Sequence, residues 1–159
     1  MAGHDLPVVS VVVPVYAGTA ALPELAQRLA DTMSAAGLTH ELILVDDRGD
    51  PRAWSVICDV ARSHSEVRGF RLGRNFGQHA ATTCGIAQAR GQWVVTMDDD
   101  LEHRPEAVPK LLEACDEQHQ LVYGVFPVRT HAWYRNITSE LMRWTLKRAV
   151  PDLNDRYTS

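Results

Sequence analysis

A cluster of acidic residues lies past the middle of the sequence, where the apolar run VVTM is followed by Asp98, Asp99, Asp100 and, two positions later, Glu102. Neighbouring carboxylates repel one another, so a fold that holds them together must gain something from a cation or from a reaction. Side chains alternate along an extended chain, and we therefore expect Asp98 and Asp100 to face one pocket with Asp99 turned away. Such oxygen ligands suit Mg²⁺ or Mn²⁺, which bind through one or two carboxylates together with substrate phosphates.

A second interpretation of the acidic cluster needs no cation. Pro105 suits the first turn of a helix, and acids near a helix N-terminus interact favourably with its dipole. Glu106 fits this interpretation well, whereas three consecutive aspartates directly after a buried strand fit it poorly. The sequence therefore favours a site for a metal ion and phosphate.

Other polar residues of unusual type also follow apolar runs. They are Tyr16, Asp46, Asp47, Arg74 and Asn75. In sheets of parallel strands, ligands bind beyond the carboxyl ends of the strands. If the apolar runs are such strands, these residues and the acidic cluster meet at one edge of the sheet.

The spacing of apolar residues predicts the elements that position this site. Nearly continuous apolar runs predict buried strands over residues 8–16, 41–45, 67–72 and 92–97, and a short fifth strand over 121–126. Helical spacing predicts a helix through Leu22, Leu25, Leu29 and Met33 that Gly37 closes, a second marked by Trp54, Ile57 and Val60, a third over 79–89, and a fourth from Pro105 to Leu112. Alternating strands and helices predict an α/β fold, with a Rossmann-like, mostly parallel sheet and helices on both faces.

Composition excludes several classes of protein. A length of 159 residues suits one domain, and the net charge of −4 argues against general nucleic-acid binding. The three cysteines include no C-x-x-C pair, which argues against disulfides and zinc and favours a reducing, cytoplasmic setting. The N-terminus lacks the pattern of a signal peptide, and no apolar stretch is long enough to span a membrane.

The last part of the chain, from about residue 129, has a different character. Its charges are mostly basic, and Ile137, Leu141 and Trp144 would share one face of a helix. One interpretation is a surface helix docked by its apolar stripe. The other is a basic amphipathic helix near a membrane surface or a phosphorylated acceptor.

Four motifs in order carry a resemblance to a known family: PVY (14–16), VDD (45–47), RNFG (74–77) and MDDDLEHRPE (97–106). The chain resembles the GT-A nucleotide-sugar glycosyltransferases of family 2, and among them the polyprenyl-phosphate glycosyltransferases most closely. The resemblance implies a nucleotide-sugar-binding GT-A core over residues 1–128 and the start of an acceptor-side region over 129–159. The chain is short for such a catalytic domain, as a truncated one would be.

The resemblance implies roles for the matching residues. Pro14, Tyr16 and Asp46 match positions that hold the nucleotide base, and Asp47 lies in the same turn. Asp98 and Asp100 match the two acids of the D-x-D motif, which contact the ribose and the Mg²⁺ or Mn²⁺ ion and support catalysis. Glu102 stands where the family often has glutamine, and it adds a possible third metal ligand.

The segment RNFGQHAA (74–81) resembles a segment of undecaprenyl-phosphate transferases. The resemblance implies that Arg74, Asn75, Gly77 and His79 contact the sugar or the diphosphate, since a guanidinium neutralises phosphate and glycine lets the backbone approach a ligand. The plainer alternative is a turn that Asn75 caps, with His79 at the start of a helix.

The implied reaction is inverting transfer of a sugar from a nucleotide-sugar donor, UDP-sugar favoured and GDP-sugar possible, to a polyprenyl phosphate. Arg129 and Arg135 are candidates for holding the acceptor phosphate. The expected location is the cytoplasm or the cytoplasmic face of a membrane. Peripheral contact with the membrane and assembly into a homo-oligomer both stay open.

Three rival functions stay open. One is a transferase that acts on a hydroxyl of a glycan, and another is a nucleotide-sugar-binding fragment without turnover. The third is a receiver-type signalling domain, but there the acidic pair follows the first strand and a lysine ends the fifth. Here the first strand ends in PVY, and the region of the fifth lacks a lysine.

Overall fold

The computed structural model describes residues 6–17, 19–116 and 118–124. The chain falls into two compact units, Met1–Tyr123 and Gly124–Ser159, and the features below belong to the first. The predicted boundary at residue 128, the basic amphipathic helix, and Arg129 and Arg135 lie outside the described residues. They stay predictions.

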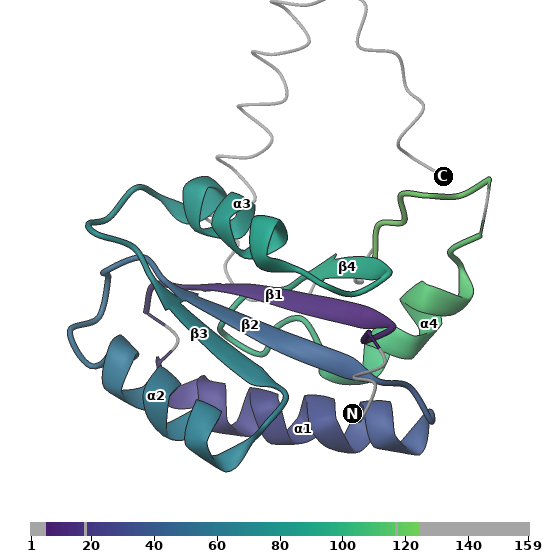
Figure 1. The fold of residues 1–159 in the computed structure, drawn as a ribbon, viewed down its shortest axis with the longest axis horizontal. Coiled ribbons are helices and arrows are strands. Elements are labelled where there is room, and N and C mark those ends of the chain that lie inside the picture. Colours follow the sequence, from purple (N-terminus) through teal and green to yellow (C-terminus); the bar gives the residue numbers. More distant parts are fainter. Residues whose placement is uncertain (1–5, 18, 117, 125–159) are drawn as a thin grey trace, which may run out of the picture. The chain divides into compact units, whose positions relative to one another are not determined.

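Four parallel strands form one sheet in the order β3-β2-β1-β4 (Figure 1). The strands are β1 (Val9–Val15), β2 (His40–Asp46), β3 (Val67–Arg71) and β4 (Trp93–Thr96). β1 is buried along its whole length and pairs with β2 from Val9 opposite His40 to Val15 opposite Asp46. Because all the pairings are parallel, the carboxyl ends of the four strands lie at the same edge.

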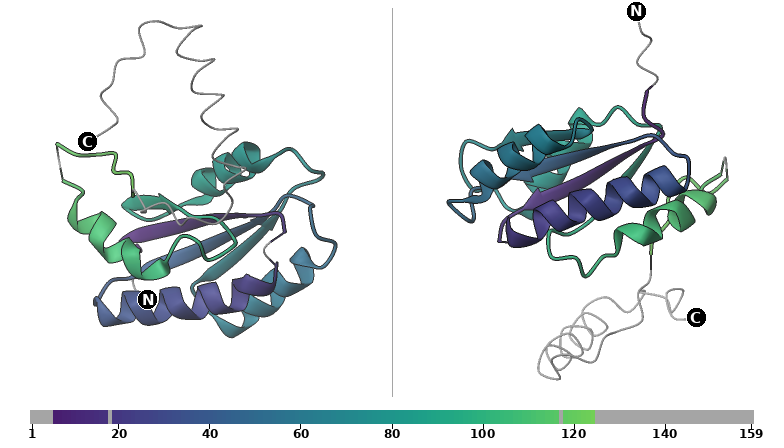
Figure 2. Two further views of the ribbon diagram at one scale, coloured as in Figure 1. Left: turned by 180° about the vertical axis from the view of Figure 1, so that it is seen from behind. Right: turned by 90° about the horizontal axis from the view of Figure 1, so that it is seen from below.

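Helices cover both faces of this sheet (Figure 2). They are α1 (Leu22–Ala35), α2 (Ala53–Ser63), α3 (Gln78–Gln88) and α4 (Val108–Glu113). α1 and α2 pack on one face of the sheet, and α3 packs on the other, against β1 and β2. The predicted α/β class, with a mostly parallel sheet between helices, is therefore confirmed.

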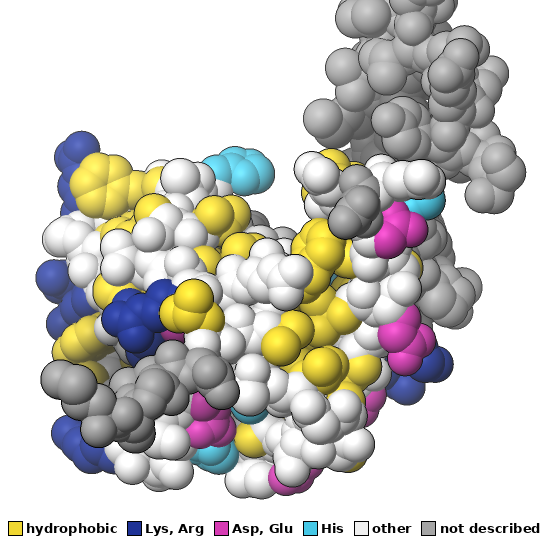
Figure 3. Space-filling model, turned by 45° about the vertical axis from the view of Figure 1, so that its right-hand side comes forward, with side chains coloured by type: hydrophobic (Ala, Val, Ile, Leu, Met, Phe, Trp, Pro, Cys, Tyr) yellow, Lys and Arg dark blue, Asp and Glu magenta, His cyan; other side chains and the backbone are white. Residues whose placement is uncertain are grey.

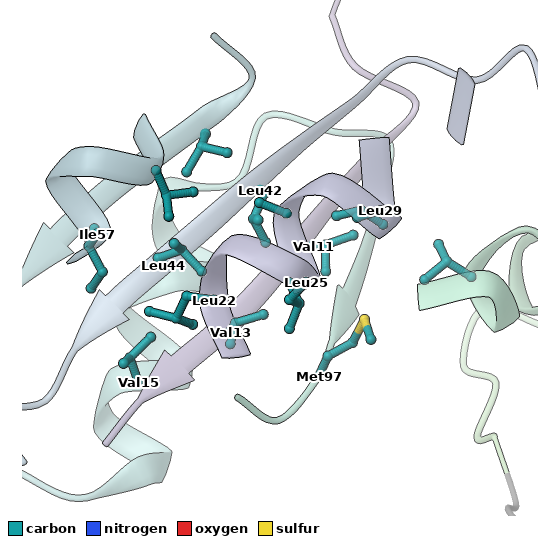
Figure 4. Packing of buried hydrophobic residues seen from close by; sticks show 14 of the residues in the cluster. Val11, Val13, Val15, Leu22, Leu25, Leu29, Leu42, Leu44, Ile57 and Met97 are labelled. Atoms are coloured by element: carbon teal, nitrogen blue, oxygen red, sulfur yellow. The ribbon is translucent and has the colours of Figure 1, made fainter. Parts of the chain in front are cut away.

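The main core lies between the sheet and α1 (Figure 4). Leu22, Leu25 and Leu29 recur at helical spacing and are fully buried against Val11 and Val13 of β1. A helix with apolar residues at this spacing presents a continuous stripe to the core. The helix therefore forms where its sequence predicts it.

α3 approaches the opposite face closely because small residues line its contact. Ala81 and Gly85 are its buried residues. A Cβ at Gly85 would overlap Val12 Cγ1 and lie 3.2 Å from Val45 Cγ2. Glycine at this position sets how near α3 can come to the sheet, and hence where its N-terminus lies.

The helix predicted from Pro105 begins later than expected. Pro105–Ala107 form a short 3₁₀ turn, η2, and the α-helix begins at Val108. The physical reason is Pro109, whose nitrogen cannot donate the hydrogen bond that would continue an α-helix from Pro105. η2 is held to α1 by Arg28, whose Nε and Nη2 each lie 2.8 Å from a carboxylate oxygen of Glu106.

The predicted fifth strand is wrong in its described part, because residues 121–124 form no strand. β4 therefore has a strand partner on one side only among the described residues. Figure 3 shows hydrophobic side chains gathered on the side of the molecule where β4 and α4 lie. Val94, Leu121 and Tyr123 are among the exposed large hydrophobic residues. No helix among the described residues is long and apolar enough to cross a membrane.

Candidate functional site

A cavity of about 550 Å³ lies at the carboxyl edge of the sheet. Its volume is in the range of sites for small molecules. The residues that line it come from the ends of β1, β2 and β4 and from the loop before α3: Pro14, Val15, Tyr16, Ala17, Asp47, Asn75, Gly77, Gln78, Asp98, Asp99 and Asp100. The structure thus brings all four motifs of the sequence to one cavity.

Asp98 is held by two neighbours. Its Oδ1 accepts a hydrogen bond of 2.9 Å from Nε2 of Gln78, the first residue of α3. Its backbone N–H donates to Nδ1 of His103 at 3.2 Å, and the same nitrogen lies 3.5 Å from Asp98 Oδ2. The hydrogen bond from the Asp98 backbone requires that Nδ1 of His103 carry no proton, whereas an ion pair with the Asp98 carboxylate would require a proton there. The backbone contact is the shorter of the two. Asp98 is therefore oriented from α3 and from its own turn.

Asp99 is not turned away from the cavity, and this expectation is wrong. It lines the cavity, and its Oδ2 accepts hydrogen bonds from the backbone nitrogens of Tyr16 and Ala17 at 2.9 and 3.2 Å. The expectation assumed that strand alternation continues through the acidic run. β4 ends at Thr96, and the chain enters a turn at Asp99, so the alternation no longer applies.

Asp100 is exposed at the cavity, and its Oδ1 accepts a hydrogen bond of 2.9 Å from the backbone of Glu102. Between them, Leu101 has a φ of 62°, a left-handed conformation that costs energy for a residue with a bulky side chain. Strain of this kind is found where the surrounding structure fixes a particular turn. The Glu102 side chain is exposed, and Glu102 is not among the lining residues.

The two aspartates after β2 have different surroundings. Asp46 is fully buried, does not line the cavity, and accepts a hydrogen bond of 2.7 Å from the backbone of Arg48. Its Oδ2 lies 2.9 Å from Arg71 Nε, but without the alignment of a hydrogen bond. Asp47 lines the cavity, and its two oxygens accept the N–H groups of Phe76 and Gly77 at 2.8 and 2.9 Å. Of the two, Asp47 lines the cavity and Asp46 does not.

Tyr16 has a fixed backbone and an exposed ring. Its N–H donates to Asp99, and its carbonyl accepts a hydrogen bond of 2.8 Å from the backbone of Asp50. As a residue Tyr16 is 58% exposed, and it lines the cavity. An aromatic ring in this position offers a flat apolar surface for a base.

The loop before α3 divides its residues between the cavity and the surface. Asn75 and Gly77 line the cavity, and Asn75 Oδ1 accepts the N–H of Gly77 at 3.0 Å. Gly77 has a φ of 91° and a ψ of 157°, a conformation open essentially to glycine alone. Arg74 stacks on the exposed ring of Phe76, 4.7 Å from its centroid, and neither Arg74 nor His79 lines the cavity.

Several residues of the cavity were not among the candidates from the sequence. Gln78 is the most informative, since its side chain binds Asp98 directly. It belongs to the RNFGQ motif, so the motif could have indicated it. Val15 and Ala17 line the cavity beside Tyr16 and carry no chemical signal of their own in the sequence.

The donor atoms at the cavity fit a small divalent cation in part. No group of three His, Cys, Asp or Glu side chains placed to hold a metal occurs in the described part of the chain. A Mg²⁺ or Mn²⁺ ion bound together with a diphosphate needs only one or two carboxylates, because phosphate and water oxygens complete its shell. Asp98 and Asp100 supply hard oxygen atoms of this kind at one cavity. Glu102 as a third ligand stays a prediction.

Comparisons with known proteins agree on one family. The family model "Glycosyl transferase family 2" matches residues 10–157. The undecaprenyl-phosphate 4-deoxy-4-formamido-L-arabinose transferase of Aeromonas hydrophila is 35% identical over 151 residues, which cover 94% of this chain and 46% of that protein. The enzyme of the same name from Edwardsiella ictaluri is 36% identical over 143 residues, covering 89% and 44%. The chain spans a little under half the length of these relatives.

Solved structures share the fold at low sequence identity. A mannosyltransferase from Pyrobaculum calidifontis, solved with GDP-Man and Mn²⁺, matches 61% of this chain and 28% of its own with a TM-score of 0.53 and 21% identity. S. aureus TarS, solved with UDP-GlcNAc, matches 67% and 30% with a TM-score of 0.53 and 22% identity. The family match over nearly the whole sequence, the relatives and the shared fold agree, and the chain belongs to glycosyl transferase family 2.

Proposed function

We propose that this chain carries the donor-binding part of an inverting glycosyltransferase that moves a sugar from a UDP-sugar to a polyprenyl phosphate. The observation that carries the proposal is the cavity at the carboxyl edge of the sheet, where Tyr16, Asp47 and the run Asp98–Asp100 meet. The names of the relatives, which are undecaprenyl-phosphate transferases, support the acceptor class. The preference for UDP rests on the resemblance of the motifs.

The donor would use two sides of the cavity. The nucleotide base would lie against the exposed ring of Tyr16, near Asp47 and Pro14. The diphosphate would lie toward Asp98 and Asp100, with Asn75 and Gly77 on the other side. A Mg²⁺ or Mn²⁺ ion held by Asp98 and Asp100 would supply Lewis-acid stabilisation of the charge on the leaving diphosphate.

The acceptor would attack the anomeric carbon of the sugar from the face opposite the diphosphate. A new bond forms between a phosphate oxygen and the anomeric carbon while the bond to the nucleoside diphosphate breaks, and the leaving group takes the electron pair. A phosphate nucleophile is already ionised at neutral pH, so this reaction requires no strong general base. Arg129 and Arg135 are the proposed contacts for the acceptor phosphate, at the cytoplasmic face of a membrane.

A second candidate function is binding of a nucleotide sugar without turnover. The observation that favours it is that the cavity supplies residues for a donor in itself, whatever acceptor the protein uses. Both candidates predict the same donor site, and only the first predicts transfer.

Calorimetric titration with UDP, GDP and their sugar conjugates in the presence of Mn²⁺ tests the donor site. We expect metal-dependent binding of UDP, and in Asp100→Ala an affinity at least about tenfold lower, because a charged ligand of the metal is lost. Glu113→Gln, an exposed change on α4, is the matched control and should bind as the wild type does. Metal-dependent binding that survives Asp100→Ala unchanged would contradict the assigned site.

Transfer of labelled sugar tests the acceptor. We expect label on a short polyprenyl phosphate and none on a sugar hydroxyl. Label on the hydroxyl alone would replace the proposed acceptor by a glycan. Donor binding with no transfer to either acceptor would support the second candidate function, which is binding of a nucleotide sugar without turnover.

A further inference from the structure

Asp98 and Asp100, the two acids of the D-x-D pattern, are held in the same way. Asp98 Oδ1 accepts a hydrogen bond of 2.9 Å from Nε2 of Gln78, and Asp100 Oδ1 accepts one of 2.9 Å from the backbone N–H of Glu102. At Oδ2 of Asp98 the contact is longer, 3.5 Å to Nδ1 of His103. In each carboxylate, an amide N–H therefore engages Oδ1.

The direction of the bond between Gln78 and Asp98 follows from the chemistry of the two groups. An ionised carboxylate only accepts hydrogen bonds, so the NH₂ group of Gln78, and not its carbonyl oxygen, must face Asp98. The bond joins residues 20 positions apart, namely the first residue of α3 and the turn after β4. Both residues line the cavity.

The donor of this bond comes from an element that is itself held in place. The N–H of Gly77, the residue before Gln78, donates to Asp47 Oδ2 at 2.9 Å. The carbonyl of Gln78 accepts a hydrogen bond of 2.9 Å from the Thr82 hydroxyl, and α3 packs closely on the sheet at Gly85. A side chain that starts from a fixed helix orients a neighbour more precisely than one that starts from a loop.

We propose that Gln78 is a positioning residue, which holds Asp98 by Oδ1 and so presents Oδ2 to the cation of the donor site. Hydrogen-bonded partners of metal-binding carboxylates orient these ligands. Since the amide engages Oδ1, Asp98 would give the cation one oxygen rather than two. The proposal rests on the proposed function, because it assumes that a divalent cation and a nucleotide bind at this cavity.

A carboxylate that offers one oxygen suits some cations better than others. Mg²⁺ requires nearly ideal octahedral geometry and binds through one or two carboxylates together with water and phosphate oxygens, and Mn²⁺ shares its preference for six oxygens. Ca²⁺ has a larger and more flexible shell and accepts a carboxylate through one oxygen or through both. An Asp98 that Gln78 holds therefore favours Mg²⁺ or Mn²⁺, whereas an Asp98 that is released is free to turn and bind Ca²⁺ with both oxygens.

Hydrogen exchange of side-chain amides, measured by NMR, tests the contact without any ligand. The NH₂ protons of Gln78, identified by their absence in Gln78→Met, should exchange roughly threefold faster or more in Asp98→Ala than in the wild type. The NH₂ protons of Gln88, an exposed residue at the other end of α3, should exchange equally in both proteins. Equal exchange at Gln78 in the two proteins would overturn the proposal.

Calorimetry with UDP and either Mn²⁺ or Ca²⁺ tests the consequence for the cation. Gln78→Met nearly keeps the length of the side chain and removes the amide donor. We expect its affinity for UDP with Mn²⁺ to fall roughly tenfold or more, the loss typical when a hydrogen-bonded partner of a metal ligand is removed. With Ca²⁺ the loss should be smaller, because this ion accepts a carboxylate in either mode. Gln88→Met is the matched control and should bind as the wild type does with both cations.

The results distinguish positioning from a purely structural role. Gln78 is exposed and the side chain of Asp98 is 43% exposed, so Gln78→Met should have the same Tm as Gln88→Met. Unchanged affinity with Mn²⁺, or equal losses with the two cations, would overturn the proposal, since a residue that only supports the fold would affect both cations alike. If the wild type binds no UDP with either cation, the proposed function fails, and the exchange experiment still decides whether Gln78 holds Asp98.

Discussion

Four aspartates line the cavity, and each has different neighbours. Asp47 and Asp99 accept N–H groups of loops that lie across from them, whereas Asp98 is bound by Gln78 and Asp100 by the backbone of its own turn. A carboxylate that accepts backbone hydrogen bonds fixes the geometry of the site, and one that is exposed to the cavity is available to a ligand. The four aspartates therefore contribute to the cavity in different ways.

The use of both oxygens by Asp47 leads to a prediction about the stability of the fold. In Asp47→Asn, one of the two N–H groups of Phe76 and Gly77 must face the NH₂ group, whichever way the amide is turned. Asp47 is only 2% exposed, so water cannot readily replace the lost acceptor. We expect the free energy of unfolding to fall by about 1–3 kcal/mol, measured by urea denaturation. Glu113→Gln, an exposed change on α4, is the matched control, and a stability of Asp47→Asn equal to that of the wild type would contradict the account.

The sequence predicted where Asp98 and Asp100 lie, but it did not predict that Asp99 lines the cavity and that Asp46 does not. The D-x-D pattern and the strand before it placed Asp98 and Asp100 correctly at the edge of the sheet. The role of Asp99 could not be predicted, because it depends on a turn with a left-handed Leu101 and on backbone groups more than 80 residues away. Asp46 shows the same limit, since only the structure places Arg71 beside it.

At the scale of the elements, α3 is fixed at both ends and pressed against the sheet in between. Its N-terminus is tied through Gly77 to Asp47, and the connection after its C-terminus is tied to Glu41 of β2. Gly85 allows the close packing between these ends. The position of α3 sets the position of Gln78, and therefore the orientation of Asp98.

Gly85→Ala should destabilise the protein although alanine favours helices. The added methyl group would overlap Val12 Cγ1, and overpacking of a core costs about 1–3 kcal/mol, more than the gain of about 1 kcal/mol in helix propensity. We expect a lower free energy of unfolding in urea. The double variant Gly85→Ala with Val12→Ala should lose less than the sum of the two single changes. Additive losses would show that α3 does not meet the sheet at this contact.

The amino edge of the sheet contains a buried ionic network around Glu41. The Glu41 carboxylate, 6% exposed as a residue, accepts hydrogen bonds from the Ser10 hydroxyl, the Arg68 guanidinium and the backbone of Arg90 at 2.7 to 2.8 Å. Burial, the largest single influence, raises the pKa of this carboxyl, but the hydrogen bonds together outweigh it and lower the pKa below its usual value. The network holds the start of β4 to β1 and β2.

The lowered pKa of Glu41 fixes the direction of a pH dependence. A carboxyl whose pKa is lower in the folded than in the unfolded state stabilises the fold above the unfolded pKa, and this contribution disappears as the pH falls through the folded pKa. Glu41→Gln should therefore cost about 3 kcal/mol at pH 7, and the difference from the wild type should shrink below the usual pKa of 4.5. Urea denaturation across this range measures it. A difference that is constant with pH would contradict the account.

Elements with strong patterns were predicted well, and the failures have local causes. β1 and β2 carry nearly continuous apolar runs and formed as expected. The last helix was shortened by Pro109, and the fifth strand was predicted from a short apolar run with no partner identified for it. A strand needs a neighbour as well as a suitable sequence, and the pattern of residues 121–124 specifies none.

At the scale of the whole molecule, the cavity is assembled from residues between 14 and 100. A ligand that binds only the folded chain raises its apparent stability in proportion to the logarithm of ligand concentration over Kd. UDP with Mn²⁺, at about 100 times its Kd, should therefore add about 2.7 kcal/mol, seen as a rise in Tm. In Asp100→Ala, with an affinity at least about tenfold lower, the same ligand concentration should add about 1.4 kcal/mol or less, and an equal rise in both proteins would contradict the site.

The order of the strands has a consequence for synthesis on the ribosome. β1 can pair with β2 as soon as residue 46 has emerged, but β4 follows more than 45 residues later and pairs with β1 from the other side. Asp98, Asp99 and Asp100 arrive with β4, so the nascent chain contains Tyr16 and Asp47 before it possesses any of them. Until β4 pairs with β1, the loop after β1 lacks the Asp99 carboxylate that accepts its N–H groups. The cavity lacks the lining residues Asp98, Asp99 and Asp100 until then. The cavity that we propose for the donor therefore forms only when the sheet is complete.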